Sequence, residues 1–204
     1  MNLKVFHGEG SGNLFNLICA LKYAIVNQAD IINLSLGFYA KENPKVLDTI
    51  LDITLANNIL VVSSSGNDGS DNNNIVNGEH YPSSYNKENM IAVAALNETN
   101  TDVWEDANFG RAKVNIATSG EHIYSTYING QYAWLSGTSM AAGKISEIAA
   151  NHLAKTNNYE QTRKCIIDPS SNSALQILPS NKTIGTVQGS RVQIIDYSAL
   201  SNCQ

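Results

Sequence analysis

A block of small residues that runs directly into a helix constrains this chain more than any other stretch. Positions 136–142 read SGTSMAA, and an Ala-rich helical pattern continues from them through Leu153. A serine at such a junction has its hydroxyl near a helix N-terminus, where unpaired backbone N–H groups favour developing negative charge. Gly137 allows close approach of backbone or ligand, and the small neighbours leave room for an acyl group. The block predicts either a nucleophilic serine or a Ser/Thr N-cap before a buried helix.

Two other blocks end apolar strands in small polar residues and glycine. Positions 30–37 read DIINLSLG, and positions 61–69 read VVSSSGNDG. Together with the first block, they resemble the subtilisin-like serine proteases (subtilases), in the same order and with nearly the same spacing. The resemblance covers about residues 3 to 199, and it implies a subtilisin-like fold and serine-endopeptidase chemistry.

The resemblance also assigns two catalytic roles. It implies that Ser139 attacks the scissile carbonyl and that the side-chain amide of Asn67 stabilises the resulting oxyanion. Taken alone, Asn67 also fits a left-handed turn residue between Gly66 and Gly69.

Substrate in this family lies as an extended strand between two backbone edges. The first edge is matched by Gly10, Ser11 and Gly12, and the second by Ser35, Leu36 and Gly37. The pocket for the substrate residue before the scissile bond is matched by Ser63, Ser64, Ser65 and Gly66. Three serines where the family usually has alanines predict a more polar pocket wall. Ordinary turn chemistry is the alternative explanation for all of these segments.

A serine hydroxyl becomes a good nucleophile only when a base accepts its proton and a carboxylate orients that base. The resemblance places the catalytic Asp and His upstream of positions 30–37, so we expect the segments that carry them to lie outside these 204 residues. We therefore expect the chain to be inactive alone. A partner chain or segment would have to supply the missing Asp and His.

The four histidines of the chain do not match a family motif, and each is predicted to be a surface or packing residue: His7, His80, His122 and His152. His152 lies 13 residues beyond Ser139 on the same predicted helix. At about 1.5 Å per residue, that separation is roughly 20 Å, well beyond hydrogen-bonding distance.

Two functions from different classes remain. The first is a serine endopeptidase domain that acts on peptide or protein substrates. The second is a catalytically dead pseudoenzyme that binds peptides or proteins, and a truncated product without a role is a third alternative. The intact blocks favour the first, whereas the missing Asp and His favour the others, as does Gly143-Lys144, where the family nearly always has Pro-His.

The order of elements predicts an α/β fold, a three-layer doubly wound and mostly parallel sheet, in one domain over residues 1–204. We expect strands at 3–6, 31–36, 59–64, 90–96, 114–117 (near an edge) and 191–195. We expect helices opened by Asn13, by Asn43-Pro44 and by Asn158, besides the one after position 137. The fold would be incomplete in its N-terminal part, because the family has a central strand between 3–6 and 31–36. Those two strands would then pair directly, or leave an exposed edge that a partner could cover.

Composition limits the partners. A net charge of -5 without a Lys/Arg cluster argues against nucleic acid, and no apolar run reaches the roughly 18 residues that a membrane span needs. The N-terminus does not read as a signal peptide, which favours the cytoplasm. Cys19 lies on an apolar helical face, so we expect a buried free thiol. We expect no cofactor and no metal. Subtilases often bind calcium, and the resemblance therefore makes calcium an alternative. The loop 68–74, however, lacks a spaced set of carboxylates and is predicted to be solvated.

Overall fold

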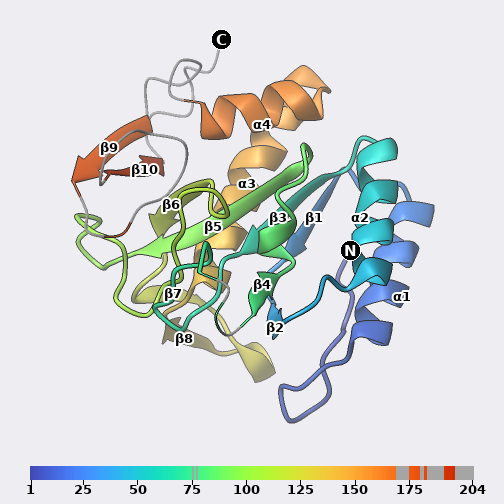
Figure 1. The fold of residues 1–204 in the computed structure, drawn as a ribbon, viewed down its shortest axis with the longest axis horizontal. Coiled ribbons are helices and arrows are strands. Elements are labelled where there is room, and N and C mark those ends of the chain that lie inside the picture. Colours follow the sequence, from blue (N-terminus) through green and yellow to red (C-terminus); the bar gives the residue numbers. More distant parts are fainter. Residues whose placement is uncertain (75, 77, 169–174, 180–181, 183–190, 196–204) are drawn as a thin grey trace.

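A parallel β-sheet carries the fold of this chain (Figure 1). The computed structural model describes residues 1–74, 76, 78–168, 175–179, 182 and 191–195. The strands of the sheet are, in spatial order, β1 (Ile31–Leu34), β3 (Leu60–Ser64), β5 (Met90–Leu96), β6 (Ile116–Ser119), β10 (Arg191–Ile195) and β9 (Leu175–Pro179). Neighbours from β1 to β10 are parallel, and β9 is antiparallel to β10.

Helices cover both faces of the sheet, and the alternation of side chains along β3 shows how. Val61 packs into a core with α1 (Leu14–Val26) and α2 (Lys45–Ala56). Leu60 and Val62 pack on the opposite face with α3 (Thr138–Thr156) and α4 (Tyr159–Ile167). The predicted three-layer α/β fold with a mostly parallel sheet is therefore confirmed.

Short elements project beyond the carboxyl ends of the central strands. β2 (Phe38–Ala40) pairs with β4 (Glu79–Tyr81), and β7 (Ile123–Thr126) pairs with β8 (Tyr132–Leu135), both antiparallel. Two 3-10 turns complete the description, η1 (Ser83–Tyr85) and η2 (Ile128–Gly130). The sequence patterns did not predict these elements.

The predicted helix starts are confirmed by their caps. The Asn13 side chain accepts a hydrogen bond from the Asn16 N–H, and the Asn158 side chain accepts one from the Gln161 N–H. These bonds satisfy backbone donors that a helix start leaves unpaired. The helix expected from Asn43-Pro44 is α2, which begins at Lys45 with Pro44 at its N-cap and without a side-chain capping bond.

Three local predictions are wrong. Residues 3–6 do not form a strand, because Phe6 makes a single bridge to Gly12 across a tight turn within the same segment. The strand expected at 114–117 is β6, which lies between β5 and β10 rather than near an edge. Cys19 is free, as expected, but it is exposed rather than buried.

No helix in the described part of the chain combines the length and the apolar character that crossing a membrane would need.

Candidate active site

The start of α3 and the end of β1 are joined by two reciprocal contacts. Ser139, the second residue of α3, is partly buried, and its Oγ donates to the Ser35 carbonyl oxygen at 3.4 Å. In return, Ser35 Oγ donates to the Ser139 carbonyl oxygen at 2.8 Å. The predicted nucleophile thus lies directly beside one of the two predicted substrate edges.

Asn67 is held by its oxygen and leaves its amide free to donate. Asn67 Oδ1 accepts from the Thr138 N–H at 2.9 Å and from Thr138 Oγ1 at 2.8 Å. A Cβ built on Gly137 would lie 3.4 Å from Asn67 Nδ2, so this amide reaches the start of α3. Among the described residues, no hydrogen bond uses Nδ2. The arrangement directs an N–H donor toward the residue before Thr138 and Ser139.

Gly66 can only be glycine at this position. Its φ of +108° disfavours any side chain, and a Cβ would collide with Asn108 Nδ2. Its backbone N–H lies 3.2 Å from Thr138 Oγ1, which completes the link between the end of β3 and the start of α3.

The hydroxyls of the three serines before Gly66 point to protein partners. Ser63 Oγ donates to the Ser64 carbonyl, Ser64 Oγ lies 3.4 Å from the carbonyls of Leu34 and Leu36, and Ser65 Oγ donates to the Asn108 carbonyl. All three serines are buried. Their polarity therefore stabilises the loops around the site.

Asn108, which the sequence did not single out, organises the loop after Asn67. It is fully buried. Its Oδ1 accepts from the N–H groups of Asp68 and Ser70 at 2.9 and 3.1 Å, and its Nδ2 donates to Tyr39 Oη and Asn72 Oδ1 at 2.7 and 3.0 Å. No sequence signal distinguishes this asparagine from the many others in the chain.

His80 packs between the segments that contain Gly37 and Gly66. A Cβ on Gly37 would collide with the His80 ring at Nε2, and one on Gly66 would lie 3.0 Å from its Cδ2. The ring is buried, and burial lowers the pKa of His80 to about 4. His80 is therefore neutral at pH 7.

The other predicted substrate edge, Gly10–Gly12, makes hydrogen bonds within its own turn. Gly10, Ser11 and Gly12 are exposed, and they close a turn in which the His7 N–H donates to the Ser11 carbonyl at 2.8 Å. No hydrogen bond within the described residues joins them to Ser139 or Asn67.

Three of the histidines form hydrogen bonds with residues other than Ser139. His80 Nδ1 bonds to Ser83 Oγ, His122 Nδ1 to Glu98 Oε1 and His152 Nδ1 to Thr162 Oγ1. In the described part of the chain, no histidine forms a hydrogen bond with Ser139.

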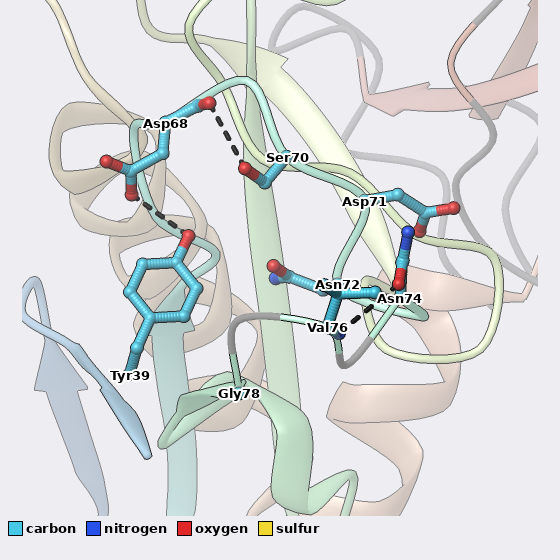
Figure 2. Close-up of a pocket in the computed structure, with 8 residues that line it drawn as sticks. All are labelled: Tyr39, Asp68, Ser70, Asp71, Asn72, Asn74, Val76 and Gly78. Carbon is cyan, nitrogen blue, oxygen red and sulfur yellow. Dashed lines mark hydrogen bonds between the residues drawn. The ribbon is translucent and has the colours of Figure 1, made fainter. Parts of the chain in front are cut away.

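The loop after Asn67 does not fit a calcium site. This loop lines a pocket of about 390 Å³. In Figure 2, Asp68 lies at the left of the loop and Asp71 at the right, and their carboxylates point away from one another. Asp68 Oδ2 accepts from Tyr39 Oη, and Asp71 Oδ1 accepts from the Asn73 N–H. Calcium requires six to eight oxygen ligands, whereas the described residues contain no group of three or more acidic, His or Cys side chains placed to hold a metal ion.

β1 is an edge strand of the described sheet, and Ser35, which contacts Ser139, directly follows it. Within the described residues it pairs only with β3, and the Leu60 N–H donates to the Asp30 carbonyl at 3.0 Å. Alternate residues of a parallel strand bond to the same neighbour. Ile31 and Asn33 therefore turn their backbone groups toward the open edge.

A groove of about 980 Å³ follows this open edge. The two flanking helices line it with apolar and small side chains: Leu17, Ala20, Leu21 and Ala24 from α1, and Ser146, Ala150, Leu153 and Ala154 from α3. The N-terminal residues Met1, Asn2, Leu3 and Val5 also line it. The groove has the character of a surface that a further segment of polypeptide could cover.

Comparison with known proteins identifies relatives over most of the chain. The model described as "Subtilase family" matches residues 1–185. The minor extracellular protease Epr of Bacillus subtilis (strain 168) is 34% identical over 174 residues, which cover 81% of this chain and 25% of Epr. Subtilisin DY of Bacillus licheniformis is 33% identical over 153 residues, which cover 75% of this chain and 53% of that protein.

Solved structures agree with the fold. The prenylagaramide maturation protease PagA matches with a TM-score of 0.69 and 27% identity, over 82% of this chain and 61% of that one. A lanthipeptide protease matches with a TM-score of 0.76 and 19% identity, over 98% of this chain and 68% of that one. The chain spans about a quarter to a half of the length of Epr and Subtilisin DY.

Proposed function

The chain belongs to the subtilase family, and we propose that its residues 1–204 form one domain that supplies the nucleophile and oxyanion site of a serine endopeptidase. Ser139 is the nucleophile, and Asn67 donates its side-chain amide to the oxyanion of the tetrahedral intermediate. The substrate is a peptide or protein, in keeping with the family. Its backbone lies along the edges formed by Gly10–Gly12 and Ser35–Gly37.

The double hydrogen bond from Thr138 to Asn67 Oδ1 is the observation that carries this proposal. An asparagine amide stabilises an oxyanion only if its nitrogen, rather than its oxygen, points at the reacting carbonyl. Because Oδ1 is occupied by two donors, Nδ2 is left to serve that role beside the start of α3. The donor is then in place before substrate binds, which is the condition for electrostatic stabilisation.

The acid–base partners of Ser139 come from a segment outside these 204 residues, in the same polypeptide or in another. We propose that this segment adds a strand to the open edge of β1 and fills the groove between α1 and α3. Two observations support this placement: the outward backbone groups of Ile31 and Asn33, and the groove of about 980 Å³ along them. Ser35, which contacts Ser139, follows directly on this edge.

A labelling experiment tests the proposal. The purified chain is incubated with a fluorophosphonate probe, alone and with a polypeptide segment that carries the catalytic Asp and His of a subtilase. We expect labelling only with the segment, and none when its His is replaced by Ala or when the chain carries Ser139→Ala. Labelling of Ser139→Ala at the wild-type rate, or no labelling with the segment, would contradict the proposal.

A second candidate is a pseudoenzyme that binds peptides without cleaving them. One observation that favours it is the hydrogen bond of Ser139 Oγ to a backbone carbonyl. The other is Gly143-Lys144, which stands where the family nearly always has Pro-His, and in which Lys144 donates to Ser119 Oγ. This candidate predicts that peptides bind to the chain and that no Asp/His segment produces labelling.

A further inference from the structure

The His80 ring lies between Gly37 and Gly66, which belong to two of the segments proposed to hold the substrate. We propose that the imidazole of His80 occupies the pocket for the substrate residue before the scissile bond, so that the site accepts glycine or alanine there and excludes large side chains. The inference rests on the proposed function, since it takes Ser35–Gly37 and Ser64–Gly66 as the walls that hold the substrate. It defines the substrate class of that same site.

The contacts of the ring place it against both walls. A Cβ on Gly37 would collide with His80 Nε2, and a Cβ on Gly66 would lie 3.0 Å from His80 Cδ2. Because Gly37 and Gly66 have no side chains, neither residue fills the space between the two backbone segments. The imidazole is thus the group that fills the space between the two backbone segments.

The ring is fixed in this position by the strand that carries it. β4 pairs with β2, and this pairing sets His80 opposite Tyr39, whose ring meets the imidazole edge-on at a centroid distance of 5.2 Å. Ser83 Oγ donates to the His80 carbonyl oxygen at 3.1 Å and lies 2.8 Å from His80 Nδ1. The Ser83 hydroxyl thus contacts both the backbone and the ring of His80.

This double contact with Ser83 makes the imidazole a rigid part of the pocket. Moving the ring aside for a large substrate side chain would break the bond to Ser83 and the packing on Tyr39. Only 4% of His80 is exposed, so the ring has little open space to move into. Glycine and alanine need no such movement, because they place at most one methyl group in the pocket.

Peptide binding tests the inference without requiring catalysis. Two acetylated tetrapeptides that differ only in a final Ala or Phe are titrated into the chain by calorimetry. We expect wild type to bind the Ala peptide tighter by about tenfold or more, and His80→Gly to bind the Phe peptide at least as tightly as the Ala peptide. His122→Gly, which removes an exposed histidine bonded to Glu98, should keep the wild-type preference.

A second variant and a rescue with imidazole complete the experiment. His80→Ser, which retains a small polar side chain beside Ser83, replaces His80→Gly if that variant does not fold. Added imidazole should refill the space in His80→Gly and weaken binding of the Phe peptide, while leaving the Ala peptide unaffected.

Equal binding of both peptides to wild type, or a wild-type preference that persists in His80→Gly and His80→Ser, would overturn the inference. Absence of any peptide binding would overturn it together with the proposed substrate edges. Failure of the labelling experiment alone, with the Ala preference intact, would remove the catalytic role of Ser139 and leave the small-residue pocket standing.

Discussion

Asn67 Oδ1 accepts two hydrogen bonds from Thr138, one from its backbone N–H at 2.9 Å and one from its hydroxyl at 2.8 Å. This pair joins the loop after β3 to the first residue of α3. It therefore holds the proposed oxyanion donor and the proposed nucleophile in one fixed geometry, and a shift of either element would separate them.

Removing the hydroxyl of Thr138 tests this link. Thr138→Val keeps the side-chain shape but leaves Asn67 Oδ1 with one donor. We expect the labelling rate of Ser139, measured with the Asp/His segment, to fall about tenfold and the free energy of unfolding to fall by about 1–2 kcal/mol. Thr138→Ser retains the hydroxyl and should label at nearly the wild-type rate. Wild-type labelling of Thr138→Val would show that the hydroxyl does not position Asn67.

Gly66→Ala should destabilise the chain. The backbone has a φ of +108°, and the new Cβ would collide with the buried side chain of Asn108. Strain at such a position costs about 1–3 kcal/mol before the collision is counted, so we expect a loss of at least about 2 kcal/mol in urea unfolding. Gly143→Ala is the matched control, because nothing lies within 4 Å of its Cβ and alanine favours the helix by about 0.5–1 kcal/mol. Equal stability of the two variants would refute the constraint at Gly66.

Asn108→Ala should weaken the loop that carries Asn67. The substitution removes the partners of four groups, which are the N–H groups of Asp68 and Ser70 and the side chains of Tyr39 and Asn72. Asn72 is buried, whereas the contacts to Asp68, Ser70 and Tyr39 are part-buried. A buried group left unpaired costs about 1–3 kcal/mol, so we expect a loss of about 2 kcal/mol by urea unfolding. Asn16→Ala on α1, where only the backbone N–H of Asn16 is used for capping, should change stability little.

Stability should depend on pH through His80. Burial lowers its pKa from 6.5 to about 4, and the charge of Asp68 opposes this only in part. Between these values the unfolded chain binds a proton that the folded chain does not, so the free energy of unfolding falls as pH falls through this window. The contribution lost between pH 7 and pH 5 is about 2 kcal/mol.

Urea unfolding of wild type and His80→Gln at pH 7 and pH 5 measures this contribution. The other titrating groups are the same in both proteins, so the difference isolates His80. We expect wild type to lose more stability than His80→Gln on acidification. An equal loss in the two proteins would contradict a neutral, buried His80.

Local signals in the sequence predicted the elements that depend on local chemistry. The helix starts at Asn13 and Asn158 were predictable because a capping side chain bonds to a backbone N–H three residues later. The apolar run 90–96 predicted β5 with its observed bounds, because a strand buried on both faces has no polar positions. β2 and β4 were missed, since strands of three residues are too short to carry a pattern.

The site was only partly predictable, for a physical reason. Ser139 and Asn67 stood out through blocks that resemble a family, whereas Asn108 and His80 act through partners distant in the sequence. Asn108 meets Asp68 and Ser70 across 40 and 38 positions, and His80 meets Gly37 because β4 pairs with β2. The strand predicted at 3–6 failed because Phe6 and Gly12 close a local turn instead of pairing with the sheet.

The most direct test of the central claim is to identify the residue that carries the adduct when the chain is treated with the fluorophosphonate probe and the Asp/His segment. Proteolysis and tandem mass spectrometry locate the phosphonate on a single serine. We predict that it lies on Ser139 and that replacing Asn67 with Ala slows its formation. An adduct on Ser35, Ser136 or another serine, or formation at an unchanged rate in Asn67→Ala, would contradict the assignment of nucleophile and oxyanion donor.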